Sequence, residues 1–153
     1  MIREARHRDA DLLAAMQAEA FPEDRWPPLG FMTLMAHPAT SAFIAEEPEG
    51  PAGFALVRCV ADEAEVITLG VRPDFRRRGI AKALIDAMRG RAAARGAARL
   101  FLEVAEDNDA AQALYAACGF TAVGRRPGYY RRSGGTVAAL LLRIETGTET
   151  KSP

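Results

Sequence analysis

Apolar residues recur along the chain in short runs that alternate with polar residues or end at turn residues. Runs of this kind, rich in β-branched and aromatic residues, predict β-strands. Seven such segments occur, at 1–5, 41–47, 52–60, 64–71, 98–106, 120–130 and 136–145. The run at 98–106 is apolar for most of its length, which predicts a central strand. Gly70, near the end of the fourth strand, predicts a β-bulge at that place.

Apolar residues at helical spacing predict helices between these strands. Asp9 is expected to cap the first helix, and the prolines of FPEDRWPPLG end it. Gly96 is expected to stop the third helix, and Asn108 and Gly119 are expected to cap and close the last one. The predicted ranges are 10 to about 20, about 31–36, 80 to about 95, and 109–118.

The predicted order of elements is β-α-α-β-β-β-α-β-α-β-β. A run of hairpins beside β-α-β units predicts a mixed sheet with helices on both faces, an α/β fold in the broad sense that includes α+β. The 153 residues suffice for one domain with a real core. We expect this domain to cover 1–145 and a flexible C-terminal tail to cover 146–153, because TGTETKSP is typical of disordered segments.

Charge and cysteine content narrow the classes of function. The chain has 20 Lys plus Arg and 20 Asp plus Glu, which argues against general nucleic-acid binding but leaves a local basic patch open. The start MIREARHRDADLL lacks a signal-peptide run, and charges interrupt the apolar segments, so we expect a cytoplasmic protein without a membrane partner. Cys59 and Cys118 give no zinc spacing, and His7 and His37 are isolated, so no metal site is expected.

The segment Arg76-Arg77-Arg78-Gly79-Ile80-Ala81 concentrates charge at the start of a predicted helix. A helix N-terminus offers unpaired N–H groups and the positive end of the helix dipole, and a phosphate is the usual guest. Gly79 leaves the backbone uncovered for a close approach. A Walker-type loop and a dinucleotide fingerprint both lack their glycines here. The alternative is that this segment is a solvated arginine loop without a ligand. Considered without the rest of the chain, the segment favours this alternative.

Three stretches together carry a resemblance to a known family. The pattern Arg76-x-x-Gly79-x-Ala81 resembles the pyrophosphate loop of the GNAT N-acetyltransferase superfamily. EAEVITLGVRPDFRRRGIAKALI and LEVAEDNDAAQALYAACGF resemble its fourth strand, third helix, fifth strand and fourth helix. AFPEDRW and GRRPGYY are similar to the bacterial ribosomal-protein alanine N-acetyltransferase branch. The resemblance spans residues 2–144 and implies a single, mostly antiparallel seven-stranded GNAT-like domain.

This resemblance implies an enzyme that binds acetyl-CoA and passes the acetyl group directly to an amine. The pyrophosphate is then held by the loop and by the first backbone N–H groups of the helix. A backbone N–H at the end of the fourth strand then faces the thioester oxygen, and the strand splays from its neighbour to admit the pantetheine arm. The implied cofactor-binding residues are Leu69, Val71, Arg76, Arg77, Arg78, Gly79, Ile80, Ala81, Lys82 and Asn108.

Tyr115 is the candidate acid for the departing thiolate, because a phenol stays protonated at neutral pH. Its place on an apolar helix stripe also fits a core tyrosine, and it is the family spacing around it that favours catalysis. Glu103 interrupts an apolar strand and is the candidate base, as in the alanine N-acetyltransferase branch. Glu65 is a second candidate, although an exposed strand glutamate is the commoner case. Asn108 is expected to cap its helix and is a candidate contact of pantetheine.

Aromatic residues are the candidates for binding the acceptor amine. Tyr129 and Tyr130 lie in GRRPGYYRR, which is either the rim of a substrate groove or an RNA contact, and we favour the rim. Trp26 either lines the groove or is a buried anchor. Pro27 stands where the branch usually has a serine, and GGTVAALLL lacks the aspartate that usually precedes the last strand. Both departures concern the acceptor more than the chemistry.

Three functional hypotheses remain. The first is transfer to a protein N-terminal amine, with a ribosomal protein as one candidate partner. The second keeps the enzyme class but takes a small-molecule amine or a lysine side chain as acceptor. The third is a non-catalytic acyl-CoA-binding or ribosome-associated module. No sequence-specific contact with nucleic acid is expected in the first two.

Overall fold

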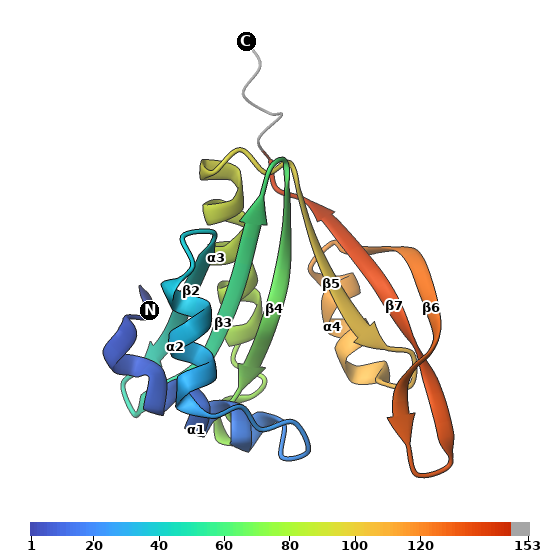
Figure 1. Ribbon diagram of the computed structural model, residues 1–153, viewed down its shortest axis with the longest axis horizontal. Coiled ribbons are helices and arrows are strands. Elements are labelled where there is room, and N and C mark those ends of the chain that lie inside the picture. Colours follow the sequence, from blue (N-terminus) through green and yellow to red (C-terminus); the bar gives the residue numbers. More distant parts are fainter. Residues whose placement is uncertain (148–153) are drawn as a thin grey trace.

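A seven-stranded sheet runs through the protein in the order β1-β2-β3-β4-β5-β7-β6 (Figure 1). The computed structural model describes residues 1–147. All neighbouring strands are antiparallel except β4 and β5, which are parallel. The strands are β1 Ile2–Glu4, β2 Thr40–Glu47, β3 Gly50–Val60, β4 Glu63–Val71, β5 Arg99–Ala105, β6 Thr121–Arg132 and β7 Gly135–Glu145. The predicted fold class, strand number and element order are therefore confirmed.

Helices cover both faces of this sheet, as predicted (Figure 1). They are α1 Ala10–Ala20, α2 Pro28–Ala36, α3 Ile80–Ala94 and α4 Asp109–Ala117, with short 3-10 turns at His7–Asp9 and Pro73–Phe75. On one face, α1 and α2 bury Leu13, Met16 and Phe31 against Ile44 and Phe54. On the other face, α3 buries its apolar stripe in a second, larger cluster with β3, β5 and β7, which residues from α4 join at its edge. The two clusters hold the sheet between them.

The strands β4 and β5 stay together only at one end. They are paired from Glu63–Glu65 of β4 to Arg99–Phe101 of β5, and beyond this point their ribbons separate (Figure 1). From Val66 onward, β4 therefore presents an edge that β5 does not cover. The resemblance predicted this separation, and it places an open edge in the middle of the sheet.

A bulge lies on β4, but not at Gly70 as predicted. The register shifts where Val57 pairs with Val66 while Leu56 pairs with Thr68, so Ile67 is the extra residue. Gly70 pairs in register with Phe54. A Cβ atom on Gly70 would lie 2.7 Å from Cε1 of the Phe54 ring. The glycine is therefore required by close packing under α1, and the prediction of a bulge there was wrong because the sequence does not show what covers the strand.

Other predicted boundaries shift by a few residues. Asp9 does not cap α1 with its side chain, because its carboxylate accepts from the backbone N–H of Arg6 at 2.7 Å and from the guanidinium of Arg3 at 3.0 Å. The second helix begins at Pro28, three residues earlier than predicted, with proline in its first turn. Thr146 is buried and donates to the carbonyl of Ala97 at 2.6 Å, so it belongs to the domain and not to the tail. Residues 148–153 of the predicted tail lie outside the described residues.

Candidate active site

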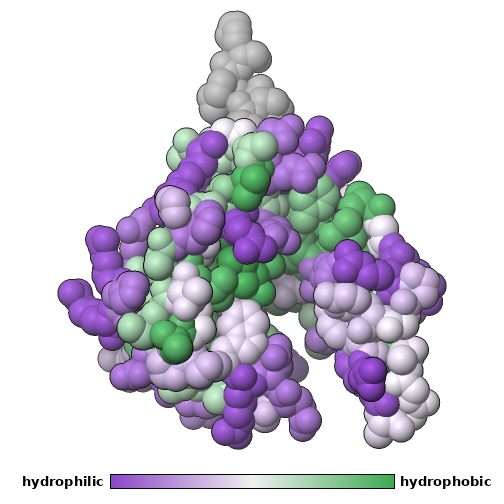
Figure 2. Space-filling model, in the orientation of Figure 1, coloured by the Kyte–Doolittle hydropathy of each residue, from purple (hydrophilic) through white to green (hydrophobic). Residues whose placement is uncertain are grey.

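A groove occupies the space between β4 and β5 where the two strands separate. Its volume is about 900 Å³. Figure 2 shows the notch that parts the body of the molecule from the β6–β7 hairpin at this place. Leu69, Val104, Asn108, Tyr115 and Tyr130 are among the residues that line it. The groove therefore gathers residues from strands, helix and hairpin that the sequence spreads over more than half of the chain.

The edge of β4 that faces the groove carries unpaired backbone groups. Arg72 donates its N–H to the carbonyl of Ala52 in β3 at 2.8 Å. Backbone groups alternate in direction along a strand, so the N–H and C=O of Leu69 and Val71 point to the opposite edge. The carbonyl of Val71 accepts from Nε of Arg76 at 3.2 Å, in agreement with this direction. The N–H of Leu69 is thus directed into the groove, where β5 has already turned away.

The start of α3, which follows β4 after the loop 72–79, forms an open cradle of backbone N–H groups. The first helical hydrogen bond runs from Ala83 N–H to the carbonyl of Gly79 at 3.1 Å. The N–H groups of the first three helical residues, 80–82, therefore precede any helical bond. Gly79 has φ +78° and Arg77 has φ +66°, which turns the loop backbone toward the helix end. A Cβ on Gly79 would meet nothing within 4 Å, so the space in front of the cradle is open.

The side chains of this loop do not all turn toward the cradle. Arg78 forms an ion pair with Glu49 at 3.1 Å and lies over the ring of Phe75 at 5.0 Å, so it points to the β2–β3 turn. The Arg78 side chain is therefore directed away from the cradle. Arg77 is exposed, and Lys82 lies 3.1 Å from Asp86 one helical turn away. Ile80 is buried in the core and anchors the helix start.

Asn108 and Tyr115 come to the groove from α4. The Oδ1 atom of Asn108 accepts from the N–H of Ala111 at 3.1 Å, which confirms the predicted helix cap. The ring of Tyr115 packs edge-on against Phe120 at 5.8 Å. Burial raises the pKa of Tyr115 to about 12. The ring packs at the edge of the core, as one alternative expected, and the residue also lines the groove, so the role of Tyr115 as the acid stays a prediction.

Glu103 and Glu65 occupy different places. Glu103 lies on β5 between two residues that are buried in the α3 cluster, so its side chain turns to the other face of the sheet. There it lies 3.1 Å from the guanidinium of Arg126 and lines the same groove as Tyr115. Glu65 instead pairs with Arg58 across β3 and β4 at 2.6 Å and lines an adjoining hollow of about 1070 Å³. Of these two glutamates, only Glu103 borders both hollows.

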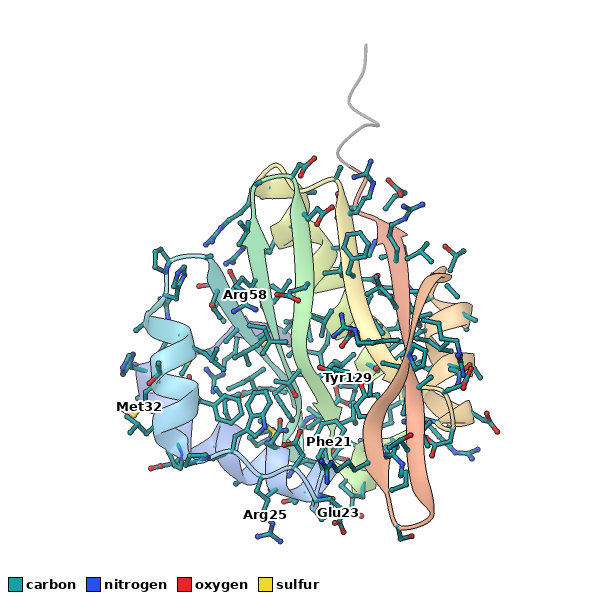
Figure 3. All side chains as sticks on the ribbon, turned by 45° about the vertical axis from the view of Figure 1, so that its right-hand side comes forward. Phe21, Glu23, Arg25, Met32, Arg58 and Tyr129 are labelled. Atoms are coloured by element: carbon teal, nitrogen blue, oxygen red, sulfur yellow. The ribbon has the colours of Figure 1, made fainter. Side chains whose placement is uncertain are left out.

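Trp26 lines the groove from the α1–α2 loop and Tyr130 lines it from the hairpin, while Tyr129 lines the adjoining hollow. Trp26 packs on Phe31 with ring centroids 5.4 Å apart, so it is both an anchor and a lining residue. Tyr130 is half-buried, and burial raises the pKa of its phenol. Tyr129 is exposed with the guanidinium of Arg126 over its ring at 4.8 Å. Figure 3 shows Tyr129 on the hairpin, and Phe21, Glu23 and Arg25 on the α1–α2 loop at the foot of the sheet.

Acidic residues outside the hairpin neutralise most of its arginines. Arg125 pairs with Glu106 at 2.9 Å, and Arg132 pairs with Asp107 at 3.0 Å. Together with the contact between Arg126 and Glu103, these pairs fasten β6 to the end of β5 and the start of α4. The hairpin is therefore built as a rim of the groove, which supports that alternative over an RNA contact. The sequence of the hairpin does not reveal these acidic partners, because they lie in other segments of the chain.

Gln17 was not among the predicted site residues, although it lines the groove from α1. It is 1% exposed and makes side-chain hydrogen bonds with Thr68 and with the backbone of Asp24. Its signal in the sequence is a single amide on the apolar stripe of α1. Within residues 1–147, no group of three or more His, Cys, Asp or Glu residues is arranged to hold a metal ion. In the same part of the chain, no helix is both long and apolar enough to cross a membrane.

Comparison with known proteins gives a consistent result. The model of the acetyltransferase (GNAT) family matches residues 9–120. An N-alpha-acetyltransferase RimI of Mycobacterium tuberculosis is 38% identical over 144 residues, which are 91% of this chain and 88% of that protein. A ribosomal protein bS18-alanine N-acetyltransferase of Escherichia coli is 37% identical over 93 residues, 61% of this chain and 63% of that protein.

Solved structures show the same likeness in three dimensions. The crystal structure of the ribosomal-protein-S18-alanine N-acetyltransferase from Escherichia coli superimposes with a TM-score of 0.86. The match has 27% sequence identity and covers 95% of this chain and 93% of that chain. The two chains therefore share one fold over most of their lengths.

Proposed function

The chain belongs to the acetyltransferase (GNAT) family, and from this membership we propose that it transfers the acetyl group of acetyl-CoA to the α-amine of a protein N-terminus. The observation that carries the proposal is the groove between β4 and β5. An unpaired strand edge, a carboxylate and a protonated phenol border this one space, and the loop 72–79 leads from the strand to the anion cradle. These are the parts that a direct acyl transfer to an amine needs.

Acetyl-CoA fits the groove as an added strand. Its pyrophosphate would lie at the N–H groups of residues 80–82, where the helix dipole and the Arg77 side chain favour negative charge. Its pantetheine arm would follow the edge of β4 past Val71 and Leu69, in the manner of a peptide that extends a sheet. Asn108 uses its Oδ1 atom for the helix cap, so its amide NH₂ stays available for a pantetheine carbonyl.

The reaction follows from this placement. The neutral amine attacks the thioester carbon, and the N–H of Leu69 stabilises the oxyanion that develops. Glu103 takes the proton that the nitrogen releases, directly or through a water molecule. The C–S bond then breaks, and the hydroxyl of Tyr115 donates a hydrogen bond to the departing sulfur. A phenol with a pKa of about 12 is a weaker acid than a thiol, so Tyr115 stabilises the thiolate as a hydrogen-bond donor, and the sulfur receives its proton from solvent afterwards.

Several features support an α-amine as the acceptor. The relatives that match at 37–38% identity carry the names of N-alpha-acetyltransferases or ribosomal protein alanine N-acetyltransferases. A terminal amine has a pKa near 8, so roughly a quarter is neutral at pH 7.5, against about a thousandth of a lysine side chain. A carboxylate base is then sufficient. A ribosomal protein with a small first residue is the first candidate to examine, although Pro27 alters the wall near Trp26.

Initial rates on a small panel of acceptors test this proposal. The panel contains a peptide that begins with alanine and includes an internal lysine, the same peptide with a formylated N-terminus, and a diamine. We expect acetylation of the free peptide and at least about tenfold slower transfer to the other two. Equal rates on the formylated peptide or the diamine would overturn the choice of acceptor. Binding of acetyl-CoA without transfer to any amine would instead favour a non-catalytic module.

A further inference from the structure

Gln17 has a polar side chain at a buried position where an apolar side chain would be expected to pack in the core. It lies on α1 beside Leu13 and Met16, which are fully buried, and is itself 1% exposed. Burial of an amide is unfavourable unless both its donor and its acceptor find partners. A methionine would fill the same volume without that requirement. The amide is therefore informative about what its hydrogen bonds hold together.

The hydrogen bonds of Gln17 have a fixed direction. Its Nε2 group donates to the backbone carbonyl of Asp24 at 3.0 Å, and a carbonyl can only accept. This turns Oε1 toward Thr68, whose hydroxyl donates to it at 2.9 Å. Both bonded side chains are buried, Thr68 being 8% exposed. The amide orientation thus follows from the partners and leaves neither end of the bridge unsatisfied.

The bridge joins two parts of the groove lining, β4 and the α1–α2 loop. Thr68 follows the bulged residue Ile67 on β4 and precedes Leu69, whose N–H is directed into the groove. Asp24 lies in the α1–α2 loop, and its carboxylate accepts from the indole N–H of Trp26 at 3.0 Å. One chain of hydrogen bonds therefore runs from the cofactor strand through Gln17 to the tryptophan that lines the acceptor wall.

We propose that Gln17 is a positioning residue, which fixes the α1–α2 loop and Trp26 relative to β4 so that the acceptor amine meets the thioester at the right distance. The identity of the acceptor rests on the proposed function, but the bridge through Gln17, here called the tether, does not. A lost tether leaves the anion cradle and the edge of β4 in place. The proposal therefore requires that acceptor binding weakens while cofactor binding stays unchanged.

Two variants break the bridge from either end. Gln17→Met removes both hydrogen bonds, and Thr68→Val removes one hydroxyl without changing the shape of the side chain. Thr68→Ser keeps the hydroxyl and serves as the rescue. Thr146→Val is the matched control, because Thr146 is also buried and its hydroxyl also donates one hydrogen bond, far from the groove. Comparable losses of stability in Thr68→Val and Thr146→Val separate positioning from general weakening.

Trp26 provides a readout that needs no activity, since it is the single tryptophan of the chain. We expect acrylamide to quench its fluorescence more strongly in Gln17→Met and Thr68→Val than in the wild type, Thr68→Ser or Thr146→Val. We also expect KM for the acceptor peptide to rise about tenfold in Gln17→Met, with a smaller change in kcat and an unchanged Kd for acetyl-CoA.

The quenching and kinetic results test the bridge through Gln17 and the proposed reaction separately. Unchanged quenching in Gln17→Met would overturn the proposal even if the enzyme is active. Increased quenching with an unchanged acceptor KM would show that the loop is tethered but does not position the acceptor, which also contradicts it. If no amine is acetylated by the wild type, the proposed function fails, while the quenching series still decides whether Gln17 holds the loop.

Discussion

Tyr115 and Glu103 have different roles in the proposed reaction, and they lie in different environments. The phenol lies against Phe120 at the edge of the core, where burial raises its pKa to about 12 and keeps it protonated. The carboxylate lies on the opposite face of β5 beside Arg126. One group is thus prepared to donate and the other to accept, on either side of the separated strands. Two side chains placed this way can serve the leaving group and the nucleophile at the same time.

Replacement of Tyr115 by phenylalanine tests the donor. The ring contact with Phe120 is kept, so we expect kcat to fall about 100-fold while the Kd for acetyl-CoA measured by calorimetry stays unchanged. In the wild type, kcat/KM should rise with pH as the acceptor amine loses its proton near pH 8 and should not fall again through ionisation of the phenol below about pH 11. A descending limb near pH 9 that disappears in Tyr115→Phe would contradict the raised pKa.

Replacement of Glu103 by glutamine tests the acceptor of the proton. We expect kcat to fall about 10- to 100-fold at pH 7, because the proton that the attacking nitrogen releases then has no carboxylate to accept it. Glu65→Gln is the control, because that carboxylate pairs with Arg58 in the adjoining hollow. Steady-state rates of the two variants on one peptide are sufficient. A larger effect from Glu65 than from Glu103 would reverse the assignment.

The functional element is the unit formed by β4, the turn after it and α3. The bulge at Ile67 and the separation from β5 leave the strand edge open, and Gly79 at φ +78° turns the chain into the helix. Ile80 anchors the start of α3 in the core, so the N–H groups of the first turn are held in place. A rigid cradle costs little entropy when an anion binds, which favours tight cofactor binding.

A carboxylate placed in the cradle should expel the cofactor. We expect Gly79→Glu to weaken acetyl-CoA binding at least about 100-fold in a calorimetric titration, because negative charge would occupy the site of the phosphate. Gly79→Ala carries the same backbone strain at φ +78° but no charge, and nothing lies within 4 Å of its Cβ. That variant should bind nearly as well as the wild type. Equal losses in both would show that strain, and not charge, sets the affinity.

Elements with local signals were predicted well from the sequence. The cap at Asn108 and the positive φ of Gly96 and Gly119 at helix ends need only neighbouring residues, and the structure confirms them. Features that depend on distant segments were missed. Gly70 was assigned a bulge because the covering ring of Phe54 cannot be seen in the sequence. The bridge through Gln17 joins residues 51 positions apart and leaves no periodic trace.

Candidate site residues show the same division. The resemblance supplied Glu103 and Tyr115, and the structure places both beside one groove. It did not show that the Arg78 side chain pairs with Glu49, because that partner lies 29 positions away in the chain. Roles in binding and catalysis stay predictions until the variants above are measured.

At the scale of the whole molecule, ion pairs tie the edges of the sheet to the surrounding turns. Five acidic partners have a pKa below its ordinary value, mainly because an arginine donates to each of them: Glu4, Asp9, Glu19, Glu106 and Asp107. Asp9 is the least exposed of them, at 10%, and receives both guanidinium N–H groups of Arg3. Exposed pairs contribute little to stability, so the pair of Asp9 should dominate the acid response.

Acid should therefore weaken the fold through Asp9. A carboxylate whose pKa is lowered by folding stabilises the protein above its unfolded pKa, here near 3.8, and loses this contribution as the pH falls through the folded value. We expect Asp9→Asn to lower the free energy of unfolding by about 1–2 kcal/mol at pH 7 and by much less at pH 3. Urea unfolding at both values checks this. Asp107→Asn, at an exposed pair, should change little, and a constant difference for Asp9→Asn at both pH values would contradict the account.

The central claim is that cofactor and acceptor α-amine meet inside the one groove between β4 and β5. The measurement that tests it most directly is the Kd of a conjugate in which an acetyl bridge joins coenzyme A to the α-amine of a peptide. We expect it to bind at least about 100-fold more tightly than coenzyme A, and more tightly than the same peptide conjugated through a lysine side chain, because one molecule then fills both sites. A conjugate that binds no better than coenzyme A alone would contradict the account.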